Sequence, residues 1–204
     1  MRDILLPALR ATLVTWLLCG IVYPLAVTGL GQWLLPYQAN GSLLRDPDGT
    51  VLGSRLIGQN WSGPQWFHGR PSATTAANPA DPNKTINAPY NAANSSGSNL
   101  GPTSRSLAER LIADRKAAEA EQPDLSGTLL PADMLTASGS GLDPDISPAY
   151  AALQMSRVAA ARGLAANQLA ALVAKNTSGR GLGIFGEPRV NVLQLNLDLE
   201  RKKD

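Results

Sequence analysis

The chain has 204 residues, and its 18 Lys and Arg nearly balance its 16 Asp and Glu. This balance provides no strong field to attract nucleic acid, and none is expected as a partner. The single cysteine excludes an intrachain disulfide. The length allows one compact domain beyond a membrane segment, and 19 Gly with 15 Pro indicate that this domain is rich in loops.

An uncharged stretch separates Arg10 from Arg45, and its first part is dominated by aliphatic residues. About 20 apolar residues in a helix span a bilayer core of about 30 Å. Arg2 and Arg10 precede the stretch, whereas no Lys or Arg closely follows it, which favours an inside location for the N-terminus. The sequence therefore predicts a cytoplasmic segment 1–10, a transmembrane helix 11–35 and an extracytoplasmic domain 36–204.

Two other interpretations of the apolar stretch stay open. A cleaved signal peptide has an apolar region of about 7 to 15 residues and a small-residue cleavage site, whereas this run is longer and ends in Pro-Tyr-Gln at 36–38. A lipoprotein signal would use Cys19, but two leucines precede it where small residues are needed. An uncleaved anchor in which Cys19 is an inert thiol is the favoured interpretation.

Small residues recur along one side of the predicted membrane helix at spacings of three, four and seven. Such a stripe is either a chance scatter on a plain anchor or a surface for close packing against other membrane helices. Pro24 lies four residues after Gly20 and predicts a mild kink. The residues of the stripe are Ala11, Thr15, Cys19, Ala26 and Gly29.

The rest of the chain predicts a mixed α+β domain. Apolar pairs separated by turn residues indicate a hairpin or two short strands in 39–59. A capping box at Ser106 predicts a helix over 106–120, in which Arg110 and Asp114 form an ion pair. An extended segment or strand is expected at 129–137, helices at 149–162 and 167–175, and a C-terminal strand over 187–199 with Leu193, Leu195, Leu197 and Leu199 on one face.

The segment 60–73 holds two Trp, one Phe and the single His in a Gly- and Pro-rich loop. Its aromatic residues either fill the core of the domain or face a partner, and the core is favoured. A lone His68 without Cys or a second His cannot build a usual zinc site, so neither a metal nor a catalytic role is assigned to it. No metal site is predicted elsewhere.

Residues 74–103 are mostly small and polar and predict ordered turns or a mobile segment. Their end resembles an anion-binding loop, because successive backbone N–H groups in a Ser-Gly-Ser run can cradle a phosphate. The run lacks the Lys and the strand-to-helix frame of a P-loop. As a phosphate site this run is therefore only a weak signal.

A second Gly- and Ser-rich loop precedes the helix at 149–162, and its residues are Ser138, Gly139, Ser140, Gly141, Asp143 and Pro144. Ser147 is expected to cap that helix with Pro148 in its first position, and Gly163 is expected to end it. The serines would be nucleophiles in a membrane-anchored hydrolase, but no motif supplies them with a base. We assign no catalytic residue, and a free-standing binding domain is the other alternative.

Several short motifs in one order resemble the C subunit of the Kdp potassium-transporting ATPase, over almost the whole chain. The matching segments are 23–25, 41–43, 56–59, 69–73, 98–102, 136–144, 146–148, Gln154, 157–159, 162–164 and 190–193. In the family pattern a His commonly stands at the position of Asp145 and a Gly at that of Ser96. These two departures leave the roles of the two side chains unassigned.

This resemblance implies a non-catalytic, single-pass subunit in the inner membrane of a bacterium. Its expected partners are a channel-like potassium-translocating subunit, a P-type ATPase subunit and the lipid bilayer. ATP, Mg²⁺ and K⁺ would be used by the complex, and no cofactor is expected on this chain itself. The family is associated with assembly and with raised ATP affinity, and this resemblance makes Ser96, Gly97, Ser98 and Asn99 a weak nucleotide candidate. Only about ten residues are expected in the cytoplasm, so an effect on ATP would be allosteric.

Overall fold

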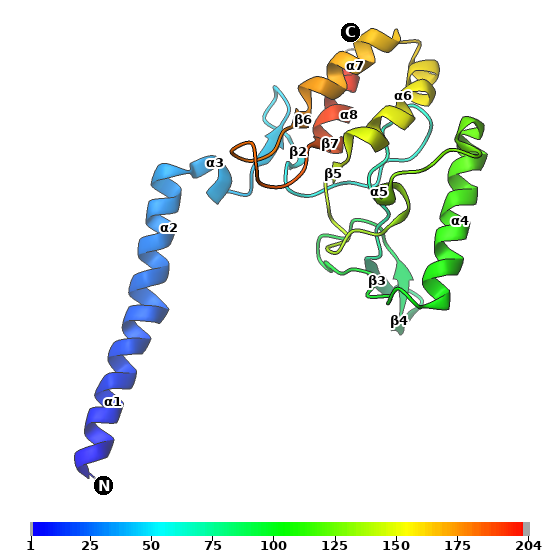
Figure 1. Cartoon of the computed structure of the whole chain (residues 1–204). Helices are drawn as coiled ribbons and strands as arrows, with labels where there is room; N and C mark the ends of the chain where they lie inside the picture. The colour runs from blue at the N-terminus through cyan, green and yellow to red at the C-terminus, as the bar shows by residue number, and fades with distance from the viewer. Residues whose placement is uncertain (1, 202–204) are drawn as a thin grey trace. The chain divides into compact units, whose positions relative to one another are not determined.

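The computed structural model describes residues 2–201 (Figure 1). The chain divides into two compact units, Met1–Ser54 and Arg55–Asp204. Among the described residues, all the buried hydrophobic side chains lie in the second unit. The first unit therefore carries the candidate membrane helix, and the second carries the core of a folded domain.

The first unit begins with a long apolar helix made of α1 (Arg2–Leu17), a π-helical turn (Leu18–Val22) and α2 (Tyr23–Leu34). Residues Asp3–Leu34 are long and apolar enough to cross a membrane, at roughly 48 Å for 32 residues. The π turn ends two residues before Pro24, which has no N–H to donate. The N–H of Tyr23 bonds Leu18 O, five residues back, so the helix absorbs the proline by a local change of hydrogen-bond register.

A short helix and a hairpin complete the first unit. Helix α3 (Pro36–Ala39) is followed by β1 (Leu43–Arg45) and β2 (Val51–Ser54), which pair antiparallel with a bulge after Leu44. The turn between them closes by a bond of 2.9 Å from Gly49 N to Asp46 O, and Gly49 has a φ of +88°. The expected hairpin is therefore confirmed, because its turn residues permit this backbone.

The second unit contains a layer of helices around a small sheet (Figure 1). Its main helices are α4 (Arg105–Glu121), α6 (Pro148–Arg162), α7 (Ala166–Lys175) and α8 (Val192–Arg201). The sheet has the order β5-β7-β6, with all neighbours antiparallel, and is built from β5 (Asp145–Ile146), β6 (Thr177–Ser178) and β7 (Arg189–Asn191). Helix α4 lies at the edge of the unit and buries no residue completely.

The ends of α6 agree with the sequence analysis. Ser147 Oγ accepts a 3.0 Å bond from Tyr150 N, and Pro148 follows as the first helical residue. Gly163 ends the helix with a φ of +65°. The N-terminal cap and the C-terminal glycine each act within one turn of the helix, which is why the sequence indicates where α6 begins and ends.

For α4 the expected cap was wrong. Ser104, not Ser106, has the extended backbone that a cap needs, and its hydroxyl accepts from Leu107 N at 3.4 Å. The expected ion pair within this helix is present, with Arg110 Nε 3.7 Å from Asp114 Oδ2.

The predicted strand over 187–199 is also wrong beyond its first residues. Only 189–191 form β7, and α8 begins at Val192. The buried residues of α8 follow a helical spacing, not the alternation of the leucines. They are Val192, Leu193, Leu195, Asn196 and Leu199.

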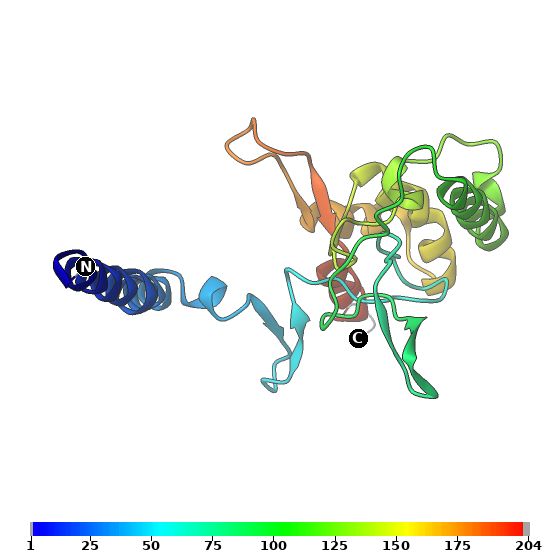
Figure 2. The ribbon, with the colours of Figure 1, turned by 90° about the horizontal axis from the view of Figure 1, so that it is seen from below.

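Two further segments differ from expectation. Within 129–137 the residues Ala132–Leu135 form a single helical turn, α5, and no strand forms there. The turn follows the 3₁₀ segment Pro123–Leu125. The segment 74–103 is not made of turns alone, because Thr75–Asn78 and Asp81–Asn87 pair as the antiparallel strands β3 and β4. This hairpin stands out from the second unit (Figure 2).

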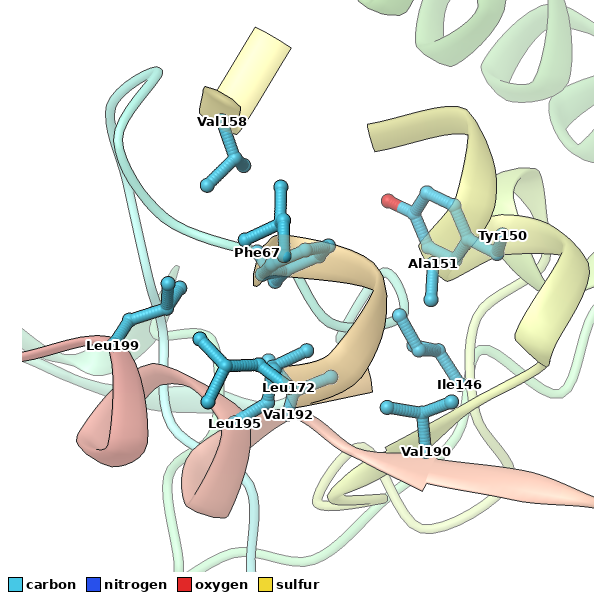
Figure 3. Close-up of a cluster of buried hydrophobic side chains, with 11 residues drawn as sticks. Phe67, Ile146, Tyr150, Ala151, Val158, Leu172, Val190, Val192, Leu195 and Leu199 are labelled. Carbon is cyan, nitrogen blue, oxygen red and sulfur yellow. The ribbon is translucent and has the colours of Figure 1, made fainter. Parts of the chain in front are cut away.

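The core lies between α6, α7, α8 and β7. Phe67 is fully buried at its centre, with Val158 of α6, Leu172 of α7 and Leu195 of α8 around it (Figure 3). The aromatic loop at 60–73 thus fills the core through Phe67, as expected. Trp61 packs on the margin of the core, and the ring of Trp66 lies 4.2 Å from the guanidinium of Arg162.

Candidate functional site

The Gly- and Ser-rich loop at 138–144 packs against three segments that are distant in sequence, 56–59, 69–74 and 90–97. Ser138 N donates to Pro71 O at 3.1 Å, and Ser72 Oγ donates to Gly141 O at 2.7 Å. Gly58 N donates to Leu142 O at 2.8 Å. We call this assembly of the segments 56–59, 69–74, 90–97 and 136–145 the polar hub.

Two glycines are needed for close packing within the polar hub. Gly141 has a φ of +67°, and a Cβ there would collide with Thr74 Cγ2 and lie 2.6 Å from Ser96 O. A Cβ on Gly97 would lie 2.8 Å from Gly139 O. Only residues without a side chain allow the loop at 138–144 and the segment 90–97 to approach so closely.

Charged side chains join the polar hub to the sheet. Arg70 Nη1 donates to Asp143 Oδ2 at 3.0 Å, and Arg70 Nη2 reaches the carbonyl oxygens of Thr136 and Ala137 at 3.4 Å. Arg189 Nε lies 3.0 Å from Asp145 Oδ2. Both carboxylates thus act as acceptors for groups on other elements, which ties the loop to its surroundings.

The sheet adds a second contact to the same loop. Asn191 Nδ2 donates to Asp145 Oδ1 at 3.1 Å and to Arg55 O at 3.0 Å. Burial raises the pKa of Asp145, although its bond from Asn191 and the charge of Arg189 act against this. Asp145 therefore has a structural partner on each oxygen.

The two serines of the loop have different surroundings. Ser138 is buried, and within residues 2–201 its hydroxyl has no hydrogen-bond partner. Ser140 Oγ accepts from Leu142 N at 3.1 Å, while Ser95 Oγ donates to Ser140 O at 3.0 Å. The imidazole of His68, which a hydrolase would use as base, is bonded to Gly63 O and not to either serine.

Two side-chain amides hold the backbone of the aromatic loop. Asn196 of α8 accepts from Phe67 N at 3.0 Å and donates to Phe67 O at 2.9 Å. Gln154 of α6 pairs with the N–H and C=O of His68 in the same manner, at 2.7 and 3.0 Å. Because each amide satisfies one donor and one acceptor, an irregular loop can lie in the core without unpaired backbone groups.

A cleft of about 370 Å³ lies beside the polar hub, between α4, α6 and the aromatic loop. His68 Nε2 lies 3.0 Å from Gly63 O, and His68 Nδ1 lies 3.6 Å from Glu121 of α4. Arg157 of α6 also faces Glu121, at 3.4 Å. Burial and the charge of Arg157 lower the pKa of His68, so the imidazole is neutral in the folded chain near pH 7.

The weak nucleotide candidate at 96–99 lies against the Gly- and Ser-rich loop at 138–144. Ser96 O is close to Gly141 and Gly97 is close to Gly139, so the backbone of this segment contributes to the polar hub. Asn99 has a φ of +51°. Among residues 2–201, no group of three or more His, Cys, Asp or Glu side chains is placed so that it could hold a metal ion.

The small stripe of the candidate membrane helix is exposed along its whole length. Its members are not covered by any other part of the described chain. Thr15 Oγ1 is bonded to Ala11 O at 2.8 Å, so its hydroxyl is satisfied within the helix and needs no partner in lipid. The exposed members are Ala11, Thr15, Cys19, Ala26 and Gly29.

Several residues of this site were missed by the sequence analysis. Gln154 and Arg157 appeared there only within motifs, and Tyr90 and Asn196 not at all. Tyr90 Oη donates to Arg70 O at 2.7 Å, and burial raises the pKa of Tyr90 to about 12. A polar residue inside an otherwise apolar helix face, such as Asn196, was the one signal that could have indicated a buried hydrogen bond.

Comparison with known proteins covers nearly the whole chain. The family model "KdpC: K+-transporting ATPase, c chain" matches residues 5–201. A potassium-transporting ATPase KdpC subunit of Rhodopseudomonas palustris (strain BisB5) is 55% identical over 95% of this chain and 94% of its own length. The KdpC subunit of Methylobacterium nodulans is 56% identical over 96% of this chain and 98% of its own length. That of Methylorubrum extorquens is 55% identical over 98% of this chain and 97% of its own length. The chain therefore belongs to the KdpC family, the c chain of the K⁺-transporting ATPase.

Proposed function

We propose that this chain is a non-catalytic, single-pass subunit that stabilises an ATP-driven potassium uptake complex in the bacterial inner membrane. Its partners are a potassium-translocating subunit and a P-type ATPase subunit. Any effect on ATP affinity is allosteric and passes through the membrane helices. The segment at 1–10 is cytoplasmic, and the domain that follows the membrane helix is periplasmic.

One observation carries the proposal beyond family membership. The membrane helix has no covered face in the described chain, since 0% of its most apolar part is buried. Small residues on one side let a neighbouring helix approach closely. A subunit that docks in a complex needs such a face, whereas an isolated enzyme needs only an anchor.

The polar hub also supports a structural role. Ser140 Oγ accepts a backbone bond, and the carbonyl of Ser140 is held by Ser95. Asp143 and Asp145 are each paired with an arginine. Groups that are tied to one another in this way shape a loop, whereas a catalytic serine needs a base within hydrogen-bond reach.

Co-purification tests the proposal. The full chain, tagged and expressed at its natural level in potassium-limited cells, is expected to bring the other two subunits with it from mild detergent. A chain that elutes alone would refute the assembly role. Replacing both Ser138 and Ser140 by Ala should leave potassium-dependent ATP hydrolysis by the complex within about twofold of the unmodified level, as expected for hydroxyls that take no part in the reaction.

Sidedness is tested separately with reporters at the C-terminus. A reporter that matures only outside the cytoplasm should be active, and one that fluoresces only inside should be dark. The opposite pair of results would reverse the proposed orientation.

A further inference from the structure

The cleft beside the polar hub has the size and the lining of a small-molecule site. Its volume of about 370 Å³ lies within the range of ligand sites and corresponds to about a dozen water molecules. One wall is a single face of α4, because the residues of α4 that line the cleft are spaced three and four apart. They are Asp114, Ala117, Ala118 and Glu121. Three aromatic residues also line it, Trp61, Tyr90 and Tyr150.

Three residues that line this cleft each have a buried polar atom without a hydrogen bond. Within residues 2–201, no partner is found for Trp61 Nε1–H, Arg70 Nε–H or Asp114 Oδ2. Asp114 Oδ2 lies 3.7 Å from Arg110 Nε, which is too far for a hydrogen bond. Because buried polar groups are normally paired, these atoms indicate that the cleft takes a polar occupant.

The charges around the cleft cancel, which selects against ions. Arg157 Nη1 lies 3.4 Å from Glu121 Oε1, and Arg70 Nη1 lies 3.0 Å from Asp143 Oδ2. Both guanidinium groups already have a carboxylate partner, and a phosphate placed here would also be repelled by Glu121 and Asp114. An ammonium group would be repelled by the two arginines in the same way. A ligand without net charge avoids both penalties.

The unpaired atoms are two donors and one acceptor, and a hydroxyl group can complement either kind. A sugar ring also presents apolar C–H faces, which suit a cleft lined by aromatic side chains. We propose that this cleft binds a neutral, polyhydroxylated molecule of monosaccharide size. Helix α4 buries no residue completely, so this wall can shift as the ligand enters.

Saturation-transfer NMR on the full chain tests for binding. The chain is kept in a detergent without a sugar headgroup, and the probes are glucose, galactose and the linear polyol mannitol. We expect at least one probe to bind with a dissociation constant of about 1 mM, since a ligand of about a dozen non-hydrogen atoms gains only modest affinity. No transfer to any of the three at about 10 mM would overturn the inference.

A pair of alanines on α4 tests the location of the site. Ala117 and Ala120 are both exposed, and only Ala117 lines the cleft. We expect Ala117→Leu to weaken binding of the tightest probe about tenfold, because the larger side chain occupies part of the cleft. Ala120→Leu should leave binding within about twofold of the unmodified chain. Equal effects would place the sugar elsewhere on the chain and overturn the inference.

Two tryptophans test the hydrogen bond. Trp61→Phe removes the indole N–H in the cleft and keeps an aromatic ring, and Trp66→Phe makes the same change at a residue that does not line it. We expect about tenfold weaker binding for Trp61→Phe and none of this loss for Trp66→Phe. Thermal unfolding of both variants checks that the fold is kept. Equal binding by the two folded variants would overturn the inference.

Charged competitors test the choice of a neutral ligand. ATP and glycine are added as an anion and a zwitterion, and neither is expected to displace the bound probe. Displacement by either at a lower concentration than glucose requires would overturn the inference. Ala117→Leu should still co-purify with the complex, so failure of this inference and failure of the proposed function are separate results.

Discussion

Two glycines with nearly the same left-handed backbone have very different surroundings. Gly141 has a φ of +67° inside the polar hub, and Gly163 has a φ of +65° at the end of α6, where a Cβ would meet nothing within 4 Å. An alanine at either position carries the same backbone strain. Only at Gly141 does the added methyl group also collide with neighbouring atoms.

We therefore expect Gly163→Ala to lower the free energy of unfolding by about 1 kcal/mol and Gly141→Ala by about 3 kcal/mol or more. Denaturant unfolding of the full chain in detergent measures both values. Equal losses would show that the close contact of Gly141 with Thr74 and Ser96 contributes nothing.

The single histidine allows a clean pH prediction. The pKa of His68 is lowered by burial and then by the charge of Arg157, with Gly63 O and Glu121 acting in the opposite sense. The unfolded chain therefore binds this proton more readily than the folded chain. The contribution of His68 to stability is fully present above the unfolded pKa of about 6.5 and falls as pH drops from there towards the folded pKa.

We expect the unmodified chain to unfold more easily at a pH of about 5.5 than at about 8, and His68→Gln to lose most of this difference. The amide of the new glutamine side chain can still donate to Gly63 O, so the comparison isolates protonation. Thermal unfolding at a series of pH values makes the measurement. An unchanged pH dependence in the variant would assign it to other groups.

At the scale of the element, the two capping serines differ in how many contacts depend on them. Ser147 caps α6, and Asp133 also accepts from its N–H and its hydroxyl, at 2.6 and 3.0 Å. Ser104 caps α4 through one longer bond of 3.4 Å, on a helix that buries no residue completely. A change at Ser147 therefore disturbs more of the structure than a change at Ser104.

Ser147→Ala should lower the free energy of unfolding by about 1–2 kcal/mol, because it removes the cap and leaves Asp133 without one partner. Ser104→Ala should cost about 0.5 kcal/mol. Equilibrium unfolding of both variants checks the order, and a larger loss at Ser104 would contradict it.

The C-terminal element shows where sequence reasoning failed. The leucines at 193, 195, 197 and 199 alternate like a strand, but a helix also brings 192, 195 and 199 to one face. In the helix 192–201 the amide of Asn196 also bonds the backbone of Phe67. That partner is 129 residues away, so a local pattern could not identify Phe67 as the residue that Asn196 bonds.

At the scale of the whole molecule, the membrane helix allows a matched test of docking. Gly29 belongs to the small stripe, and Gly31 lies about 200° around the same helix. Neither glycine has an atom within 4 Å of an added Cβ in this chain. We expect Gly29→Leu to lower recovery of the complex about tenfold and Gly31→Leu to leave it unchanged, since a bulky side chain blocks close helix packing.

Quantitative co-purification from membranes that contain equal amounts of each variant measures this difference. Equal recovery of both variants would show that the stripe is not a docking face.

The sequence by itself determined the long apolar helix, the β1–β2 hairpin and the ends of α6, because each depends on residues within a few positions of one another. Tertiary structure decided that residues 192–201 are helical and that separate motifs meet in the polar hub. Asn191, for example, bonds Arg55 O across 136 residues. Contacts of that range depend on how the whole chain packs, and a local pattern contains no information about them.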